Sequence, residues 1–529
     1  MNNLDNSPTV SRSLIYAFFL LWTLPLLVGG YEQQSLMPHD EGLYATRARL
    51  MWETGDWVNP WLKPHYKTPG IYWLLAIIYR FFGMSETTVR LPSVIFSLIA
   101  VVLVYEIGRI VINHYAGFLA AIILNLQFLW LQYSRLANPD LPTIVLILLS
   151  IFCLLKGENS LFKYRNILLG VAGLCWGLAL VFRGFMVAIP LLSLSPYLIL
   201  ENRRHHHLNN IWLYVGFILG TIPLLIWLYL SWSRFGLATF QSLFGLVVTL
   251  GNDNRHDHSS FFYVLSLASS AFPWALLSVV GLIIIWRNKF KFYKTLILGF
   301  PTIYFILISL YSTRLHHYSL GIYPFTALLS GGVLYCLWKP KQKQFIVNKR
   351  LYPTLNYIFT GSGIIFLAAA IIVFLYFKSE IQYAKIALVT SVPWIFLSLI
   401  YYQKYSRWVW LSVLLLGNWL GLLTAVNIGA IGNYSPEIKT FIQQSEVAKI
   451  INNNTIYLLE GGGETRTLFK FYLPHVQTNT IKYPPPPCSY GMSEAKFIDS
   501  YGVSYKSLAN FRDWELIQKT DCIDSNSQN

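Results

Sequence analysis

Charged residues are scarce in this sequence. Only 12% of its 529 residues are Asp, Glu, Lys or Arg, whereas 55% are hydrophobic and 16% are aromatic. A soluble globular chain carries about 25% charged residues. Apolar stretches of about 20 residues recur along most of the chain, and each is long enough to cross about 30 Å of hydrocarbon. The shortage of charge excludes a soluble globular protein and predicts a polytopic all-α membrane protein.

Acidic residues are the scarcer charge. There are 24 of them against 40 basic residues, which gives a formal net charge of +16. A nucleic-acid-binding protein gathers its Lys and Arg residues on one face or arm. Here the basic residues lie in short groups between apolar stretches, which is typical of a membrane topology signal. The distribution of charge therefore excludes nucleic acid as a partner.

Hydropathy predicts about thirteen transmembrane helices. We place them at 13–31, 91–112, 115–133, 139–156, 166–182, 184–200, 211–232, 261–286, 294–311, 317–338, 353–377, 383–401 and 408–431. One set of alternate loops carries more than twice as many basic residues as the other, so that set faces the cytoplasm. This puts the N-terminus inside, and the odd number of spans puts the C-terminus outside.

Two segments are too polar to be spans. Residues 32–90 form a long outer loop, in which the apolar and aromatic stretch 70–83 predicts a helix lying in the membrane interface. Residues 432–529 predict a small extracytoplasmic α/β domain, with strands at 455–460 and 514–521 and a helix at 465–473. The domain prediction is therefore a transmembrane domain, 1–431, which includes the outer loop, followed by an external domain, 432–529.

Cysteine is also scarce, with five residues in the chain. Cys153, Cys175 and Cys336 fall in predicted spans, where cysteine serves as a small apolar residue. Cys488 and Cys522 are the two that fall in the external domain. Because an outer compartment is oxidising, we predict a disulfide between them, with two free surface thiols as the alternative.

Several familiar catalytic signatures are missing. The chain has no nucleophile elbow, no zinc-protease motif and no dinucleotide-binding motif, and the Gly461–Gly463 run followed by Glu464 lacks the rest of a phosphate-binding loop. What the predicted outer loops do hold is a mixture of carboxylates, histidines and cations, and reactions that develop charge need such a mixture.

Single members of this mixture have ordinary explanations. Asp40 and Glu41 are also typical of the first turn of a helix. Asp140 is also typical of a helix cap, and His256 and His258 of a solvated loop. Together, however, two carboxylate sites on different outer loops flank the cationic Lys67 and Arg314. Carboxylates accept protons from attacking groups and cations hold departing phosphates, so the combination predicts group transfer from a lipid-linked phosphate.

The stretch from Met37 to Leu62, MPHDEGLYATRARLMWETGDWVNPWL, resembles the first outer loop of the protein O-mannosyltransferase and lipid A aminoarabinosyl transferase superfamily. These are integral-membrane glycosyltransferases of the C-type fold. Further along, SRLANPDLP, VFRGF, RHDHSSFFYVLSLASSAFPW and STRLHHYSLGIYP are similar to later motifs of the same superfamily. The similarity runs through residues 10–430. The residues that match, in chain order, include Asp40, Glu41, Tyr44, Asp56, Lys67, Asp140, His258 and Tyr318, and Arg183 and Arg314 stand where the superfamily carries lysine.

The resemblance implies an inverting glycosyltransferase that takes a sugar from a polyprenyl-phosphate carrier on the outer leaflet of a bacterial inner membrane. It implies catalytic roles for Asp40, Glu41 and Asp140. It also implies that Lys67, Arg183 and Arg314 hold the carrier phosphate. Substrate-site support is expected from Tyr44, Arg49, His258 and Tyr318.

Two departures from the superfamily affect these expectations. Leu43 stands where the aminoarabinosyl enzymes carry Arg, a residue connected with their lipid A acceptor. Tyr66 stands where those enzymes carry a Glu that joins a histidine in binding zinc. We therefore predict no metal site, with His258 as the remaining candidate ligand, and the lipid-linked sugar as a substrate and not a bound cofactor.

The sequence thus predicts transfer of a sugar to an outer-leaflet glycolipid similar to lipid A. A protein Ser or Thr hydroxyl is the alternative acceptor. A transporter is the alternative of another class, but transporters place ionisable groups near the bilayer midplane and are often built from repeats. Here the predicted spans are nearly free of central charges and no repeat is visible.

Overall fold

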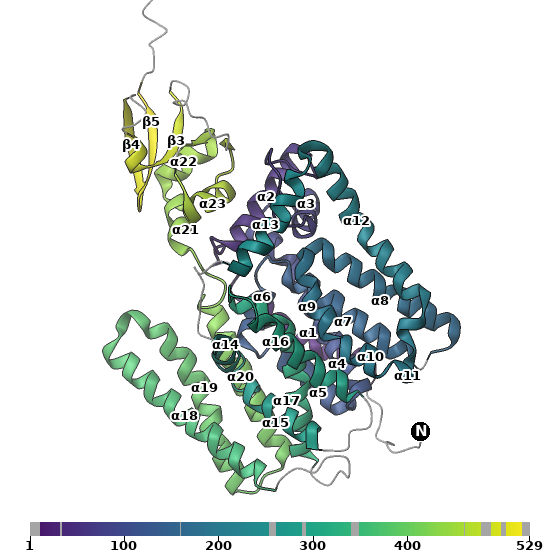
Figure 1. The fold of residues 1–529 in the computed structure, drawn as a ribbon. Helices are drawn as coiled ribbons and strands as arrows, with labels where there is room; N and C mark the ends of the chain where they lie inside the picture. The colour runs from purple at the N-terminus through teal and green to yellow at the C-terminus, as the bar shows by residue number, and fades with distance from the viewer. Residues whose placement is uncertain are drawn as a thin grey trace, which may run out of the picture.

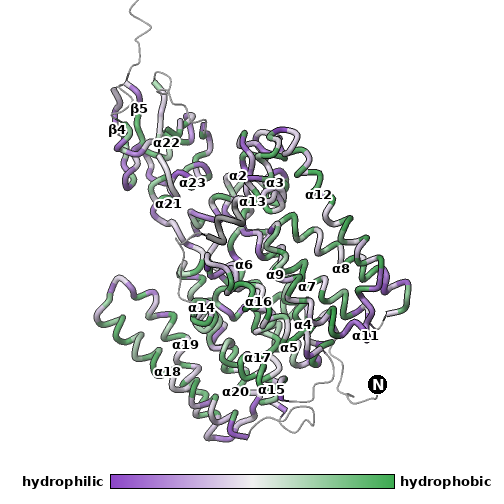
Figure 2. The backbone as a smooth tube through the Cα atoms, in the orientation of Figure 1, coloured by the Kyte–Doolittle hydropathy of each residue, from purple (hydrophilic) through white to green (hydrophobic). Residues whose placement is uncertain are grey.

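The computed structural model of the protein describes residues 11–31, 34–158, 160–252, 261–287, 293–339, 349–459, 461–477, 488–498 and 504–520. It is a bundle of long helices with a small mixed α/β unit at one end (Figure 1). Apolar residues line the long helices, and hydrophilic residues gather in the α/β unit and at helix ends (Figure 2). The predicted class, a helical membrane protein with a small C-terminal α/β unit, is confirmed.

Eight helical segments in the described residues are long and apolar enough to cross a membrane, or ten if each of two bent pairs counts as one span. The predicted count of thirteen is not confirmed. The eight are Glu86–Val111 (α4), Asp140–Gly157 (α7), Phe162–Ser193 (α8, Phe162–Arg183, with α9, Ala188–Ser193), Ile211–Phe235 (α12), His316–Trp338 (including α17, Tyr323–Trp338), Leu351–Tyr376 (α18), Lys378–Tyr402 (including α19, Ile381–Tyr402) and Arg407–Asn427 (α20).

The structure has fewer clear spans than predicted because several of the predicted spans are broken or short helices. Predicted span 115–133 is α5 (His114–Leu124) and α6 (Phe128–Ser134), which meet at 68°, and 261–286 is α14 (Phe262–Ser270) and α15 (Trp274–Arg287), which meet at 110°. The first break carries buried polar residues, one of which, Gln127, donates its amide N–H to the Tyr323 carbonyl at 3.0 Å. Pro273, which has no N–H to donate, lies at the second break. The remaining short pieces are α1 (Arg12–Val28), α10 (Ser195–Leu200), α11 (Asn202–His205) and α16 (Phe300–Ser309).

Helices α8 and α12 touch backbone to backbone. A Cβ atom added at Gly173 would lie 1.9 Å from the Leu213 carbonyl oxygen, and one at Gly216 would lie 1.9 Å from the Gly170 carbonyl oxygen. Gly177 and Gly220 continue the contact in the next turn. Small residues permit this approach between membrane helices, where van der Waals packing replaces the hydrophobic effect as the driving force. This glycine seam fixes the spacing of two helices that border the site described below.

The long loop before α4 folds into two helices, α2 (Asp40–Thr54) and α3 (Gly70–Phe82). Helix α3 confirms the helix predicted at 70–83. The loop is attached to the far end of α12, where Arg234 pairs with Asp56 at 2.5 Å and the Trp227 indole donates to the Val58 carbonyl at 3.0 Å. Because α12 starts beside α11, the loop and the basic α11 turn lie at opposite ends of the bundle (Figure 1).

The C-terminal unit contains a five-stranded sheet in the order β2-β1-β3-β5-β4. Strands β1 and β2 and strands β1 and β3 are parallel, and the other two pairs are antiparallel. Strands β1 and β5 and helix α23 confirm the three predicted elements. The strands are β1 (Ile456–Leu458), β2 (Val476–Gln477), β3 (Tyr490–Glu494), β4 (Tyr505–Phe511) and β5 (Trp514–Lys519), and the helices are α21 (Pro436–Gln443), α22 (Ser445–Asn453), α23 (Gly463–Tyr472) and α24 (Ala495–Ile498). Cys522 lies outside the described residues, so its disulfide with Cys488 stays a prediction.

Arg49 attaches this unit to the outer loop. Its side chain projects from α2 and is buried at 7% exposure, where Nε pairs with Glu53 at 2.7 Å. Its Nη atoms donate to carbonyls in the last turn of α23 and just after it: Lys470 at 2.9 Å, Leu473 at 2.7 Å and Pro474 at 2.7 Å. A helix end leaves its last carbonyls without partners, and the guanidinium supplies donors for them.

We expect Arg49→Ala to loosen the C-terminal unit. Each hydrogen bond to a charged group contributes about 1.5–3 kcal/mol, so opening of the unit and limited proteolysis between α20 and α21 should rise at least about tenfold. Arg512→Ala is the matched control, because Arg512 pairs with Glu437 at 62% and 66% exposure and exposed pairs contribute little. Equal cleavage rates for the two variants would contradict the docking role of Arg49.

Candidate active site

Asp40 and Glu41 open helix α2, where the helix dipole favours negative charge. Their side chains have different surroundings. Glu41 is buried at 1% exposure and receives two hydrogen bonds from Arg90 on α4, from Nε and Nη2, both at 2.7 Å. It also accepts the backbone N–H groups of Met37 at 2.8 Å and Ala137 at 3.2 Å. Glu41 therefore joins α2, α4 and the loop before α7, and it is a positioning residue in this geometry.

Asp40 is 37% exposed and lies 3.6 Å from the Lys67 ammonium. Lys67 comes just before α3 and also donates to the Tyr44 hydroxyl at 3.0 Å. Burial disfavours the charged form of Asp40, but the attraction of Lys67, His317 and Arg183 outweighs it and holds the pKa of Asp40 below its usual value. Asp40 is thus an ionised carboxylate at neutral pH, next to a cation that is itself a hydrogen-bond donor.

Asp140 and Arg183 form a second charged pair. Asp140 is the first residue of α7, where the Asn138 side chain accepts the backbone N–H groups of Asp140 at 2.9 Å and Leu141 at 3.1 Å. Arg183 is the last residue of α8 and donates from Nε and Nη2 to one oxygen of Asp140, at 2.8 Å from Nε. Gly184, with φ of 52°, then starts the 3₁₀ turn Gly184–Val187. The pair therefore sits where helix α7 begins and helix α8 ends.

A cavity of about 460 Å³ brings Asp40, Lys67 and Arg183 together. Its other walls are mainly apolar and come from α8, α12 and α13 (Ala238–Asn252). The larger cavity thus combines a small group of charged residues with a mainly apolar lining. The cavity is lined by Asp40, Tyr44, Tyr66, Lys67, Thr68, Ile71, Pro139, Leu180, Phe182, Arg183, Gly184, Phe185, Met186, Leu224, Leu228, Phe240, Leu243, Phe244, Tyr311, Leu315, His317 and Tyr318.

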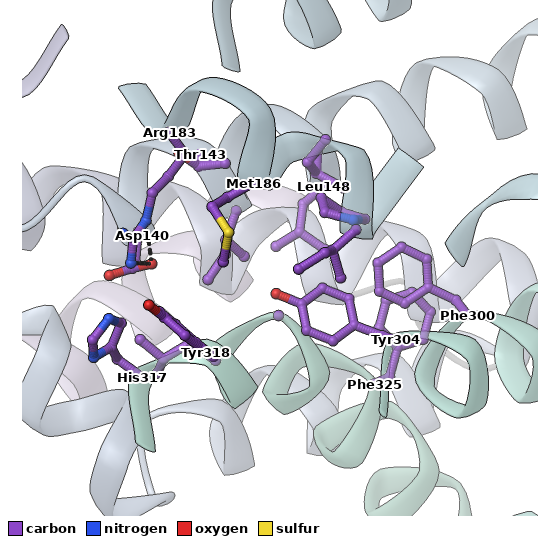
Figure 3. Close-up of a pocket in the computed structure, with 16 residues that line it drawn as sticks. Asp140, Thr143, Leu148, Arg183, Met186, Phe300, Tyr304, His317, Tyr318 and Phe325 are labelled. Carbon is purple, nitrogen blue, oxygen red and sulfur yellow. Dashed lines mark hydrogen bonds and ion pairs between the residues drawn. The ribbon is translucent and has the colours of Figure 1, made fainter. Parts of the chain in front are cut away.

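A second, smaller cavity of about 40 Å³ is also lined by Arg183 (Figure 3). It shares Arg183, Met186, His317 and Tyr318 with the larger one, and adds Asp140 and the aromatic residues Tyr304, Phe300 and Phe325. In Figure 3 the Tyr318 hydroxyl points toward the Asp140–Arg183 pair and His317 lies beside it. The two charged pairs are therefore parts of one site.

His317 is the site residue that the sequence analysis missed. It lies in the 3₁₀ turn His316–Ile322 that precedes α17, lines both cavities, and is close enough to Asp40 and Asp140 to interact with both charges. The motif STRLHHYSLGIYP contains two adjacent histidines, and sequence alone does not show which of them faces inward. The feature of the sequence that could have indicated His317 is that it directly precedes Tyr318 in that motif.

Other predicted site residues lie elsewhere. Arg49 lines neither cavity and holds the C-terminal unit instead. Arg314 is also absent from both linings, although the next residue, Leu315, lines the larger cavity. His258 lies outside the described residues. Within the described ranges, no three His, Cys, Asp or Glu residues gather closely enough to hold a metal ion.

The stretch Gly55–Trp57 of the outer loop, called the GDW motif below, fixes one wall of the larger cavity. Asp56 accepts the backbone N–H of Val58 at 2.9 Å and pairs with Arg234, and the Trp57 carbonyl accepts the Trp73 indole N–H at 2.7 Å. These contacts connect the loop to α12 and α3. The motif therefore shapes the site without lining it.

Comparisons of the sequence with known proteins find related glycosyltransferases. The family model described as dolichyl-phosphate-mannose-protein mannosyltransferase matches residues 66–230. An undecaprenyl phosphate-alpha-4-amino-4-deoxy-L-arabinose arabinosyl transferase of Pseudomonas fluorescens is 26% identical over 61% of this chain and 59% of its own length. One of Pseudomonas aeruginosa is 27% identical over 52% of this chain and 50% of its own. The chain thus spans between half and three fifths of the length of these relatives.

The fold is shared more widely. The crystal structure of ArnT from Cupriavidus metallidurans bound to undecaprenyl phosphate superposes with a TM-score of 0.75 at 17% identity, covering 97% of this chain and 98% of that one. The oligosaccharyltransferase AglB of Archaeoglobus fulgidus superposes with a TM-score of 0.54 at 11% identity, covering 92% of this chain and 69% of that one. The family model, the curated relatives and the fold agree on the superfamily of C-type-fold integral-membrane glycosyltransferases that the outer-loop motifs predicted.

Proposed function

We propose that the protein transfers a sugar from a polyprenyl-phosphate carrier to an acceptor at the outer face of the membrane. One observation carries the proposal: Lys67 and Arg183 line the same cavity as the carboxylate of Asp40, and most of the other lining residues of that cavity are apolar. Cations bind phosphate and apolar walls suit a prenyl chain. A neighbour of the same fold binds undecaprenyl phosphate, which supports this carrier as donor and membrane lipids as partners.

In the proposed reaction, the acceptor attacks the anomeric carbon from the side opposite the phosphate. A bond forms between the acceptor oxygen and that carbon, and the bond from the carbon to the phosphate oxygen breaks, so the configuration inverts. The electron pair leaves with the polyprenyl phosphate, where Lys67 and Arg183 stabilise the charge. Asp40 orients the attacking group and, where that group is a hydroxyl, accepts its proton. Asp140 holds Arg183 in place.

The proposed acceptor is a glycolipid similar to lipid A. The curated relatives that match this chain are aminoarabinosyl transferases, which supports a lipid acceptor. The family model instead describes protein mannosyltransferases, so a Ser or Thr hydroxyl of a protein is the second candidate. No metal takes part in the proposed step.

The proposal also includes a topology. The more basic loops place the N-terminus in the cytoplasm of a bacterial cell and the outer loop 32–90 outside the inner membrane. Thirteen spans then place the unit 432–529 outside as well. Residues 1–431 form the transmembrane catalytic domain. The structure supports this arrangement because the outer loop and the basic α11 turn lie at opposite ends of the bundle.

Asp40→Asn should lower transfer by about a hundredfold or more, the usual effect of losing a general base, while the variant still binds polyprenyl phosphate. Asp513→Asn, an exposed change of the same type in the C-terminal unit, should transfer normally. The measurement is single-turnover transfer by purified protein. If Asp40→Asn transferred the sugar at the wild-type rate, Asp40 would not be a catalytic residue.

The pH dependence should follow from the depressed pKa of Asp40. Because its folded pKa lies below the unfolded value, the carboxylate and the stability that it contributes are fully present above pH ~4. Both are lost as the pH falls through the lower folded pKa. The titration of Asp40 should therefore leave the transfer rate of the wild type unchanged from about pH 5 upward. An acid limb near pH 6 that disappears in Asp40→Asn would show that the pKa is raised instead.

Lys67→Ala should weaken binding of polyprenyl phosphate, whereas Lys67→Arg should retain part of it, because the charge persists in a different geometry. Arg80→Ala on neighbouring α3 is the control, since Arg80 is exposed and outside both cavities. Binding is measured by calorimetry on protein in nanodiscs. If both Lys67 variants bind the carrier as the wild type does, the phosphate lies elsewhere.

A reporter enzyme fused after Asn529 should be active only outside the cytoplasm, by the positive-inside distribution of the loops. A fusion at Asn210, beside the basic α11 turn, should give the opposite result. A cytoplasmic signal from the first fusion would mean that the number of spans is even.

A further inference from the structure

His317 lies where the two cavities meet. In the larger cavity it shares a lining with Asp40 and Lys67, and in the smaller cavity it shares a lining with Asp140. A substrate group that contacts both charged pairs therefore also reaches the His317 imidazole. The residues that line both cavities are Arg183, Met186, His317 and Tyr318.

Packing holds the His317 ring in place. Its centre lies 5.6 Å from the ring centre of Tyr133 on α6 and 4.7 Å from that of Tyr318, and the planes are inclined at 33° and 82°. The Tyr133 carbonyl accepts the Asn138 side-chain amide at 2.8 Å, and Asn138 also accepts the backbone N–H of Asp140. The ring is therefore positioned by aromatic neighbours that belong to the site.

The two nitrogen atoms of His317 have no hydrogen-bond partner among the residues that the structure describes, and Figure 3 draws no interaction to this ring. The preceding residue differs. His316 is exposed, its Nδ1 atom lies 2.8 Å from the Ser266 hydroxyl oxygen, and it lines neither cavity. Binding pockets place a few polar groups among apolar walls to fix the orientation of a ligand. The His317 nitrogens are available for that purpose.

The size of the smaller cavity restricts what reaches His317 from that side. The cavity has a volume of about 40 Å³, and one water-sized group needs about 10–15 Å³ of such space. It has room for a hydroxyl or hydroxymethyl group and not for a prenyl chain. A sugar carries substituents of this size.

The proposed reaction brings the sugar to the same place. In an in-line displacement the anomeric carbon lies between the acceptor oxygen and the phosphate oxygen, so the sugar lies between Asp40 and the cations Lys67 and Arg183. These three residues line the larger cavity together with His317. An imidazole can hydrogen-bond a sugar hydroxyl in either protonation state, because a hydroxyl both donates and accepts.

We propose that His317 binds the transferred sugar. Its imidazole hydrogen-bonds a hydroxyl group of the sugar and thereby positions the anomeric carbon between Asp40 and the carrier phosphate. This inference rests on the proposed function and extends it from the phosphate to the sugar. His317 also contributes to the choice of donor, because a sugar that lacks this hydroxyl leaves the imidazole unpaired, and unpaired polar groups are what reject such analogues.

The test compares bare and sugar-bearing carriers by calorimetry on the full chain in phosphatidylcholine nanodiscs. The probes are undecaprenyl phosphate and undecaprenyl phosphate carrying mannose, glucose or 4-amino-4-deoxy-L-arabinose. The wild type should bind at least one sugar-bearing carrier more tightly than the bare carrier. His317→Phe keeps a ring for packing and removes both nitrogens. It should weaken binding of that sugar-bearing carrier by about five- to tenfold, the scale of one hydrogen bond, and leave binding of the bare carrier unchanged.

Two further variants complete the experiment. His317→Gln retains a donor and an acceptor and should keep part of the sugar's contribution to binding, and it tests the role of His317 even if His317→Phe does not fold. His316→Phe is the matched control, because it makes the same change at the neighbouring residue that lines neither cavity. It should bind every probe as the wild type does.

The sugar-binding role would be overturned if the His317 variants weakened bare and sugar-bearing carriers equally, or weakened neither. It would also be overturned if the wild type bound all three sugar-bearing carriers no more tightly than the bare one. In each of these cases, binding of the bare carrier that Lys67→Ala weakens would leave the proposed function intact. A wild type that binds no carrier at all would refute the proposed function, and the role of His317 with it.

Discussion

The buried ion pair between Glu41 and Arg90 is the interaction on which the site depends. Arg90 is fully buried, and besides Glu41 it donates to Gln34, to the Ser35 carbonyl at 3.0 Å and to the Gly432 carbonyl at 3.0 Å. Burying two charges costs free energy that only good geometry and further hydrogen bonds offset. Besides each other, the two side chains bind the segment 34–37 before α2, the loop before α7 and Gly432. The pair therefore fixes the start of α2, the loop before α7 and the junction with the C-terminal unit at once.

The site also contains charged residues beside an apolar region. Asp40, Lys67, Asp140 and Arg183 all lie at helix ends or in loops, where water and helix dipoles reduce the cost of charge. The apolar walls from α8, α12 and α13 begin directly beside them. A substrate with a charged head and a long apolar tail fits such a boundary, because each part meets the surroundings that it prefers.

Local patterns predicted most of the fold and the principal site residues. Hydropathy located the long helices, and short segments of the polar C-terminal region were correctly predicted as β1, α23 and β5. The ordered motifs identified Asp40, Lys67, Asp140 and Arg183, which the structure brings to adjoining cavities. Hydropathy did not show the break between α5 and α6 at Asn125 and Gln127, because averaging over a window hides two polar residues. It also could not pair Glu41 with Arg90, 49 residues away, or Arg49 with the carbonyls at the end of α23.

His317 shows a further limit. A motif names the segment that approaches the site, but the side chains that face inward depend on the turn geometry and on neighbours distant in sequence. His317 is selected over His316 by the 3₁₀ turn, and its ring packs against Tyr133 from a helix distant in sequence.

The glycine seam between α8 and α12 has a mechanical consequence. Two helices whose backbones touch cannot slide or separate without losing contacts that no side chain can restore. Helices α8 and α12 therefore move together as one rigid unit. The spacing of the two helices on that side of the chamber is therefore set by the backbone. Any adjustment to lipids of different bulk has to come from the lining side chains and from other elements, such as α13, which contributes Phe240, Leu243 and Phe244.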